Sequence, residues 1–373
     1  MTQKILKIKN SDPVKSVNDF LKDILRTGKI KALLVQQEVP SKKLSFPFLI
    51  ADPEKLSSNV FSPVLPVSTA TIVSRITKFE GPKEPIGIVM RSCQIRALIE
   101  LVKLNQASLD NIIIIGVDCL GTFSINKFTD FSEKTTTTNY LFESFSKKTK
   151  DADKYLRTAC MICKNPIPTN ADLTIGVYGT DPTNELIIEA NSEQGKKLIE
   201  DFKLEEIKDQ KSREKAIETV LKDKTKKREE FIKSKESIKG IDALSEFFDK
   251  CINCHNCMKA CPICYCKECL FDSSVFDSEA YKYLKKASNR GLFKMPTDSI
   301  LFHLGRMNHM VLSCVECGLC QQACPSDIPL MEIIIPIAEN AQKEFKYKPG
   351  KDPKEKIPMI VYREDEYSEV GET

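Results

Sequence analysis

The sequence contains no long hydrophobic run, no strong excess of one charge and no glycine-rich nucleotide-binding motif. None of its apolar runs approaches the roughly 20 residues needed to cross a bilayer, and the longest, NIIIIGV at 111–117, has the length of a buried strand. The net charge of +4 is small for 373 residues, so charge gives no argument for nucleic-acid binding. Because neither GxGxxG nor a phosphate-binding loop is present, NAD use through an ordinary Rossmann motif has no support.

A secretion signal and catalytic histidine pairs are also missing. The first residues, MTQKILKIKNSDPVK, contain neither an apolar core nor a small-residue cleavage site, so we expect no signal peptide and a cytoplasmic protein. The only histidines are His255, His303 and His309, and none accompanies an obvious nucleophile. We therefore assign no catalytic acid or base, and expect these side chains to pack or, for His255, to tune a nearby site.

Cysteine, in contrast, is abundant, with 15 residues in tight groups. A secreted disulfide scaffold would be a short chain with its cysteines spread along the whole length. Here the chain has an ordinary globular composition, 41% hydrophobic and 29% charged. The grouping therefore indicates ligation of metals or iron–sulfur clusters.

Two stretches share the pattern C-x2-C-x2-C-x3-C-P, namely CINCHNCMKACP at 251–262 and CVECGLCQQACP at 314–325. In this pattern the first three thiolates bind one cubane, and the fourth, turned away by the proline, binds the other. Structural zinc is the alternative, but zinc takes two pairs of ligands and needs neither the repeated triplet nor the prolines. We therefore predict one [4Fe–4S] cluster on Cys251, Cys254, Cys257 and Cys324, and a second on Cys314, Cys317, Cys320 and Cys261.

The segment between the two motifs carries helical patterns such as SEAYKYLKKAS and TDSILFHLGRMNHMV. This favours an α-helical ferredoxin domain over a compact β-hairpin one. Cys264, Cys266 and Cys269 follow the first motif directly as C-x-C-x2-C. They either hold a further cluster with a fourth ligand from elsewhere or are buried thiols, and their spacing does not decide between the two.

The N-terminal half shows the order of a parallel βαβ unit. PIGIVM at 85–90 is typical of a strand, the apolar residues of 95–102 have helical spacing, and NIIIIGV is the next strand. Cys93 and Cys119 follow the carboxyl ends of these strands, which meet at one sheet edge, so the two thiols can come together. Cys160 and Cys163 form a C-x2-C before another strand-like run, LTIGVYG.

Three further segments are polar. Residues 120–158, rich in Thr, Ser and Lys, are expected to form a loop or an excursion. From about 205 to 238 Lys and Glu dominate, which predicts an exposed helix with i,i+4 ion pairs and a solvated face. The tail beyond about 346 is expected to wrap a neighbour or to be loose. The chain should thus divide into a domain at 1–205, a charged helical linker at 206–245, an α-helical ferredoxin domain at 246–345 and a polar tail at 346–373.

Several segments together resemble the beta subunit of coenzyme F420-reducing hydrogenase and of F420-dependent formate dehydrogenase, over roughly residues 15–240. MRSCQIRALIELVKLNQASLDNIIIIGVDCLGTF at 90–123 is similar to the family's strand, cysteine turn, helix and second cysteine. ACMICKNPIPTNADLTIGVYGTD at 159–181 is similar to its C-x2-C and following Gly-rich strand. With LFHLGRMNHM and SCVECGLCQQACPSDIP, the longer chain resembles the formate dehydrogenase subunit more than the hydrogenase one.

The resemblance implies an α/β flavin-binding domain followed by a mainly α-helical dicluster ferredoxin domain. In such enzymes FAD exchanges a hydride with coenzyme F420 and single electrons with [4Fe–4S] clusters. A partner subunit receives or supplies those electrons, and the expected partners are a formate dehydrogenase catalytic subunit, a hydrogenase or a heterodisulfide-reductase-type subunit. The family's own cluster would fall on Cys93, Cys119, Cys160 and Cys163, and FAD would lie at the same sheet edge, near Ser68 and Thr69 in the turn PVSTAT.

The chain departs from the family where cofactors should lie. A Gly-Gly pair in the first helix region is reduced to Gly28, the family's Pro-Cys is Ser92-Cys93, and PVSTAT lacks the usual glycine. These changes keep a second function open, an electron-transfer adaptor in such a complex without F420 chemistry of its own.

Overall fold

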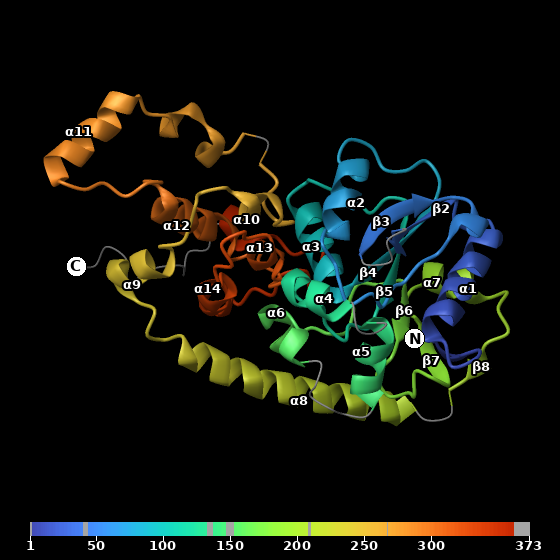
Figure 1. Ribbon diagram of the computed structural model, residues 1–373. Coiled ribbons are helices and arrows are strands. Elements are labelled where there is room, and N and C mark those ends of the chain that lie inside the picture. The colour runs from blue at the N-terminus through green and yellow to red at the C-terminus, as the bar shows by residue number, and fades with distance from the viewer. Residues whose placement is uncertain are drawn as a thin grey trace.

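The computed structural model describes residues 2–39, 44–132, 137–146, 153–207, 210–266 and 268–361 of the chain. The N-terminal half is built on a mixed sheet in the strand order β3-β2-β4-β5-β6-β7-β1-β8 (Figure 1). The four strands β2, β4, β5 and β6 are parallel, and antiparallel strands extend both sides of this group. The strands are β1 Thr2–Lys7, β2 Ala32–Glu38, β3 Ser45–Ile50, β4 Ile86–Arg91, β5 Ile112–Val117, β6 Leu173–Gly176, β7 Glu185–Ala190 and β8 Glu205–Glu206.

Helices cover both faces of this sheet and build the C-terminal half. They are α1 Pro13–Arg26, α2 Thr69–Thr77, α3 Ser92–Lys103, α4 Ile125–Ser132, α5 Thr137–Ser146, α6 Thr158–Met161, α7 Glu193–Ile199, α8 Gln210–Ser234, α9 Gly240–Phe247, α10 Asn256–Lys259, α11 Ala280–Arg290, α12 Ser299–Met310, α13 Leu319–Gln322 and α14 Met331–Glu344. Single 3-10 turns lie at Pro53–Lys55, Asp153–Tyr155, Leu270–Asp272, Ser274–Phe276 and Pro358–Ile360. Among the described residues after 207, the structure has helices and turns but no strand.

The predicted βαβ unit is present as β4, α3 and β5, with β4 and β5 paired in parallel from Ile86–Ile112 to Arg91–Val117. Because successive side chains of a strand alternate between faces, Ile112 and Ile114 join the apolar cluster under α2 and α3. Ile113 and Ile115 join the opposite cluster under α1 and α7. Each such side chain contributes roughly 1.5–3 kcal/mol when buried, which explains why this strand is almost entirely isoleucine.

The first helix shows how the local sequence defines an element. Asp12 caps α1 by accepting a hydrogen bond from the Lys15 N–H at 2.9 Å, and Pro13 occupies the first turn, where no N–H is needed. Val17, Leu21 and Ile24 recur at helical spacing and are buried against the sheet. Gly28, in the left-handed region at φ 71°, ends the turn after the helix and leads the chain into β2.

The expected loop at 120–158 is wrong in the described part of that segment, because α4 and α5 lie there. Phe128, Leu141 and Phe142 are buried and anchor these helices to the apolar clusters. The polar composition concealed this pattern, since the few apolar residues are separated by Thr, Ser and Lys. Residues 133–136 and 147–152 of the expected loop lie outside the described residues.

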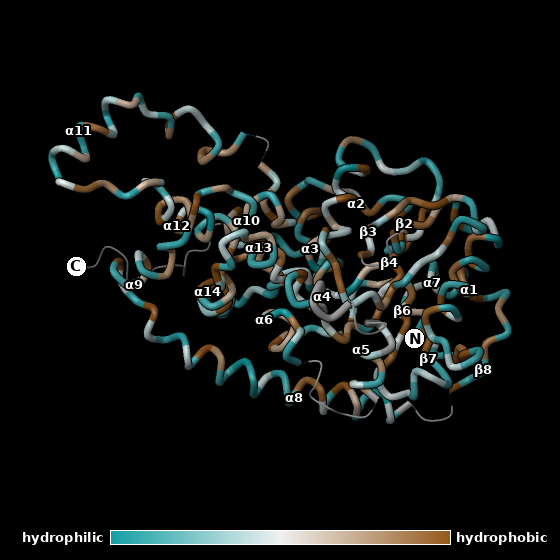
Figure 2. Tube along the Cα trace, in the orientation of Figure 1, coloured by the Kyte–Doolittle hydropathy of each residue, from teal (hydrophilic) through white to brown (hydrophobic). Residues whose placement is uncertain are grey.

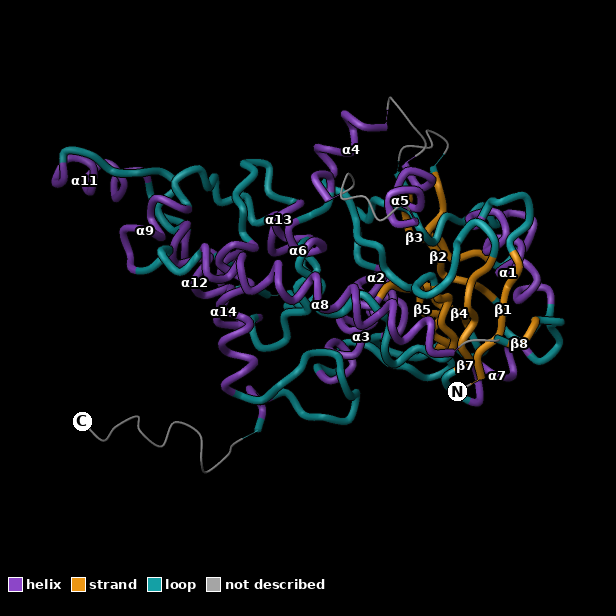
Figure 3. Tube along the Cα trace, turned by 90° about the horizontal axis from the view of Figure 1, so that it is seen from below, coloured by secondary structure: helices purple, strands orange, loops and turns teal. Residues whose placement is uncertain are grey.

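The C-terminal half places its helices around the two cysteine motifs. α12 and α14 pack against α10 and α13, and their buried Met310 and Ile335 belong to the same apolar cluster as Ile88 of the sheet. The sheet and the helical half therefore share one core. α11, in contrast, lies on an excursion that projects from the rest of the molecule in both views (Figure 1, Figure 3).

The helix predicted at 205–238 is present as α8, which runs from the sheet toward the C-terminal half along one side of the molecule (Figure 1) and is largely hydrophilic (Figure 2). The expectation of a merely solvated face is wrong for two of its arginines. Arg213 and Arg228 are each 2% exposed. Arg213 pairs with Asp118 and Glu189 at the sheet, and Arg228 pairs with acidic residues of the C-terminal half.

The first part of the tail is not loose, because it packs against the sheet half. Tyr347 is buried and its hydroxyl donates to Glu100 of α3 at 2.7 Å, while the Gly350 N–H donates to the same carboxylate at 2.8 Å. Residues 362–373 lie outside the described residues. The division of the chain at 205, 245 and 345 stays a prediction.

The helices of the described ranges are too short or too polar to cross a membrane.

Candidate functional site

The two cysteine motifs follow the same backbone path. In the first motif, Asn253 and His255 have left-handed φ angles of 53° and 59°. Glu316 and Gly318 occupy the corresponding positions of the second motif, with φ angles of 58° and 72°. A one-turn helix follows in each case, α10 or α13. Left-handed turns are unfavourable for non-glycine residues, and their repetition indicates that both motifs hold their thiols in one required arrangement.

A cavity beside the first motif collects one of the predicted ligand sets. Phe302 and His303 of α12 form part of its wall, and His303 Nε2 lies 3.4 Å from Cys251 Sγ. Burial lowers the pKa of His303 to about 3, so its imidazole is neutral. The cysteines in the lining are Cys251, Cys254, Cys257 and Cys324.

A second cavity collects the other set and is also lined by Met310 and Met331. The cysteines in its lining are Cys261, Cys314, Cys317 and Cys320. Each motif thus contributes its fourth cysteine to the cavity of the other motif. This is the crossed arrangement that the sequence predicts for two cubanes, and the ligation itself stays a prediction.

The cysteines are arranged differently from a site for a single metal ion. In the described ranges of the chain, no three His, Cys, Asp or Glu side chains come together closely enough to hold one ion. A cubane takes one thiolate at each of four separate irons, so its ligands stand around a cavity instead of meeting at a point.

The third group lies at the carboxyl edge of the parallel strands, as predicted. Cys93 is the second residue of α3, directly after β4, and Cys119 follows the end of β5 by two residues. Cys160 belongs to α6, and its Sγ lies 3.2 Å from Thr122 Oγ1. Cys163 is close enough to Cys119 and Cys160 for their charges to affect its pKa. The structure therefore brings the four N-terminal cysteines together.

Burial determines the protonation of these thiols. It raises the pKa of Cys163 to about 11 and that of Cys257 to about 12. Burial, together with the neighbouring thiols of Cys119 and Cys317, raises the pKa of Cys93 well above its usual value. Crowded, buried thiols cannot all ionise unless a cation lies among them. Iron would supply that positive charge, since metal binding displaces the thiol protons.

The N-terminal thiols lie next to the second cavity. The charge of Cys317 reaches Cys93, as its effect on the pKa of Cys93 shows. A Cβ atom on Gly318, the residue after Cys317, would be 2.9 Å from Cβ of Ala159, the residue before Cys160. The three groups of thiols therefore form a sequence in space, from the sheet edge to the second cavity and then to the first.

The three remaining cysteines have different surroundings. A hydrogen bond from Cys264 to Cys261 lowers the pKa of Cys261 to about 5. Cys269 Sγ lies 3.6 Å from Met258 Sδ, and Cys266 is exposed. Both possibilities that the sequence left open for Cys264, Cys266 and Cys269 therefore stay predictions.

The predicted flavin contacts Ser68 and Thr69 are both buried at the start of α2. Thr69 Oγ1 accepts hydrogen bonds from the side-chain amides of Gln36 at 3.1 Å and Gln94 at 3.0 Å. Its hydroxyl therefore links β2, α2 and α3 inside the protein. A flavin contact by these two residues stays a prediction.

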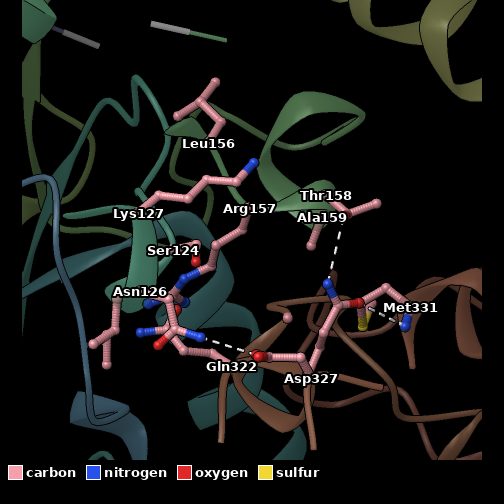
Figure 4. Close-up of a pocket in the computed structure, with 13 residues that line it drawn as sticks. Ser124, Asn126, Lys127, Leu156, Arg157, Thr158, Ala159, Gln322, Asp327 and Met331 are labelled. Carbon is pink, nitrogen blue, oxygen red and sulfur yellow. Dashed lines mark hydrogen bonds between the residues drawn. The ribbon is translucent and has the colours of Figure 1, made fainter. Parts of the chain in front are cut away.

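A polar cavity of about 120 Å³ lies beside the N-terminal thiols, between α4, α6 and α13 (Figure 4). Asn126 donates a hydrogen bond to Asp327 at 2.9 Å along its wall. Arg157, 7% exposed, donates from Nη2 to the Leu65 carbonyl at 2.5 Å, but its Nε has no partner among the described residues. The buried amide of Gln322 has no partner on either atom in the same ranges.

Sequence reasoning missed three polar side chains, Arg157, Gln322 and Arg306. Arg306 lies on the buried stripe of α12 and is 2% exposed. The signal that would have found it is a cation at helical spacing among apolar residues, in LFHLGRM. No comparable signal marks Arg157 or Gln322, because their burial depends on segments far apart in the sequence.

Two family models match the chain in the regions that carry these thiols. Residues 83–215 match the family that describes the C terminus of the coenzyme F420 hydrogenase/dehydrogenase beta subunit, and residues 246–328 match a 4Fe-4S dicluster domain. The first match is to the same family that the sequence resembles. The predicted family resemblance is confirmed, and with it the expectation of an oxidoreductase subunit.

Curated relatives extend the match over most of the chain. The F420-dependent formate dehydrogenase subunit beta of Methanocaldococcus jannaschii is 28% identical over 304 residues, covering 74% of this chain and 76% of the relative. The F420-dependent formate dehydrogenase 1 subunit beta of Methanococcus maripaludis is 27% identical over 297 residues, covering 72% and 73%. The chain is thus an iron–sulfur electron-transfer subunit with an α/β sheet half and a helical dicluster half.

Among solved structures, the F420-reducing [NiFe] hydrogenase complex of Methanosarcina barkeri contains a chain that matches with a TM-score of 0.44 and 12% identity. The match covers 65% of this chain and 94% of that one. A likeness at this level supports no argument about the site.

Proposed function

We propose that this chain transfers electrons between coenzyme F420 and a partner subunit, through FAD and three [4Fe–4S] clusters. Two clusters would be held in crossed fashion by the dicluster motifs, and the third by Cys93, Cys119, Cys160 and Cys163. The observation that carries the proposal is the spatial sequence of three four-cysteine groups, two of them around cavities, within one chain. Isolated thiol groups would have no reason to follow one another in this way.

The first cavity is the proposed exit to the partner. Cys254, in the lining of that cavity, is exposed, and the neighbouring Ile252 is 60% exposed. The cysteines of the second cavity are buried or half-buried. A partner that docks near Cys254 would therefore approach the terminal cluster closely. The relatives' names support a formate dehydrogenase catalytic subunit as that partner, and a hydrogenase or heterodisulfide-reductase-type subunit stays an alternative.

The polar cavity beside α6 supports a flavin at the sheet edge. Arg157 and Gln322 hold buried polar atoms without partners there, among the described residues, and a ligand with hydrogen-bonding groups would satisfy them. The cavity of about 120 Å³ is smaller than the roughly 300–1,000 Å³ of pockets for whole ligands. These residues would therefore hold only part of an FAD molecule. When bound, FAD supplies the exchange between a hydride and single electrons.

A second function keeps the clusters and omits the F420 step. The packing of Thr69 between Gln36 and Gln94 favours it, because the predicted flavin contact already has an internal structural role. In that case the chain is an adaptor that passes electrons between two partner proteins.

The test uses the full chain, purified without oxygen. Acid-released flavin is identified by chromatography, and reduced coenzyme F420 is then added while flavin and iron–sulfur absorbance are followed. Release of FAD and bleaching at a catalytic rate are expected. If dithionite bleaches the clusters but reduced F420 does not, the adaptor function is correct and F420 chemistry lies elsewhere.

A further inference from the structure

Arg306 is a buried cation for which the described residues supply no carboxylate partner. It belongs to the buried stripe of α12, together with Phe302, His303 and Met310. Its side chain is 2% exposed. Within the described ranges its three guanidinium nitrogens have no oxygen or nitrogen partner, and the thiols of Cys320 and Cys264 lie within reach of it. Arginine stays protonated in proteins, and an unpaired charge in a protein interior is strongly unfavourable. An anion that the protein chain does not supply as a carboxylate must therefore neutralise it.

The neighbours of this guanidinium belong to both cluster cavities. His303 and Met310, which flank Arg306 on the same buried stripe of α12, line the first and the second cavity respectively. The thiols of Cys320, Cys261, Cys257 and Cys264 are close enough for their charges to act on the guanidinium. Cys257 lines the first cavity, whereas Cys261 and Cys320 line the second. Arg306 thus lies between the two predicted clusters and close to ligands of each.

A cubane held by four thiolates carries a net negative charge, and each added electron makes it more negative. A fixed positive charge beside such a cluster stabilises the reduced form more than the oxidised form, and burial keeps the interaction strong.

We propose that Arg306 is a positioning residue that supplies one positive charge to both clusters of the dicluster half and raises their reduction potentials together. The inference rests on the proposed function, because it requires clusters at both cavities. It adds a specific consequence: the two potentials are coupled through a single side chain, so one substitution changes both.

The test compares the wild-type holoprotein with Arg306→Gln and Arg306→Lys. Arg290→Gln is the matched control, since Arg290 is the exposed last residue of α11 and loses the same charge. Iron content and spectroscopic redox titrations are the readouts. We expect Arg306→Gln to retain its iron while the equilibrium constant for reducing each of the two clusters falls at least tenfold, which corresponds to about 59 mV for one electron. Arg306→Lys should fall between wild type and Arg306→Gln.

Unchanged potentials in an iron-replete Arg306→Gln protein, relative to Arg290→Gln, would overturn the inference. If Arg306→Gln loses iron, the Lys variant decides. Iron retention in Arg306→Lys supports the need for charge, whereas equal loss in both variants assigns Arg306 to packing and overturns the inference. A wild-type protein without the dicluster signal would instead refute the proposed function itself, so the two failures are distinguishable.

Discussion

The pairing of Arg228 with the second motif predicts a measurable local loss of stability. Arg228 is 2% exposed and donates from Nη1 and Nη2 to the two oxygens of Glu316 at 2.8 and 2.6 Å, and from Nε to Glu339 at 2.5 Å. Arg228→Met leaves Glu316 as a mostly buried carboxylate without a counter-charge. Breaking a buried pair on one side costs about 3–5 kcal/mol. Glu339 can be hydrated at the surface, so we expect roughly 2–4 kcal/mol.

Hydrogen exchange is the suitable assay, because it reports local opening without assuming two-state unfolding of a large protein. Since about 1.4 kcal/mol is a factor of ten, protection of amides in α8 near Arg228 and around Glu316 should fall roughly 30- to 1,000-fold. The control is Lys222→Met, which removes only the exposed pair with Glu218, worth about 0–1 kcal/mol. Removing the carboxylate as well, in Arg228→Met with Glu316→Gln, should recover part of the protection. Equal protection in Arg228→Met and Lys222→Met would refute the reasoning.

Three further predictions concern the thiols and the packing around them. Cys324→Ala should expose Cys251, Cys254 and Cys257 to alkylation while Cys314 stays protected, because the fourth cysteine of each motif serves the cluster of the other motif. Mass mapping of alkylated thiols checks this. Alkylation of Cys314 instead would contradict the crossed ligation. Gly318→Ala should destabilise the contact with Ala159 by about 1–3 kcal/mol, because residue 318 has φ 72° and its new Cβ would lie 2.9 Å from the Ala159 Cβ. Faster amide hydrogen exchange in α6 is the readout. Unchanged exchange there would show that Ala159 moves aside freely. Tyr347→Phe should lower the free energy of unfolding by about 1.5–3 kcal/mol, since the buried Glu100 loses a hydrogen-bond donor. A lower urea midpoint of unfolding checks this. A midpoint equal to wild type would mean that Lys103 and the Gly350 N–H alone satisfy that carboxylate.

The sequence was sufficient where the determining residues are local. A short run of consecutive isoleucines predicted β5, and two complete cysteine motifs predicted which thiols share a cavity. It was not sufficient where the partner is distant. Arg228 reaches Glu316 across 88 positions, and Tyr347 reaches Glu100 across 247. A charged helix and a polar tail look solvated until the chain brings such partners together, which is why α8 and the tail were misjudged.

Arg306 and the helices α4 and α5 show two other limits. The position of a single arginine in an apolar stripe does not predict its neighbours, because these come from both cysteine motifs and from α12. α4 and α5 depend on Phe128, Leu141 and Phe142, which are too few among polar residues to give a clear period. In both cases burial is decided by tertiary contacts and not by the local pattern.

α8 fixes the spacing between the sheet-edge thiols and the second cysteine motif. Arg213 forms an ion pair with Asp118, next to Cys119, and Lys224 donates to the Cys160 carbonyl at 2.6 Å. Further along the helix, Arg228 forms an ion pair with Glu316, which lies between Cys314 and Cys317. Arg213 and Arg228 are fifteen positions apart, about four turns and roughly 22 Å of helix. Electron tunnelling weakens exponentially with distance, so under the proposed function this helix would set the transfer rate between a cluster at the sheet-edge thiols and one at the second motif. Inserting one residue between the two arginines would rotate one of them by about 100° around the helix axis relative to the other. The two ion pairs could then not form together, and α8 would no longer hold the two sites at a fixed spacing.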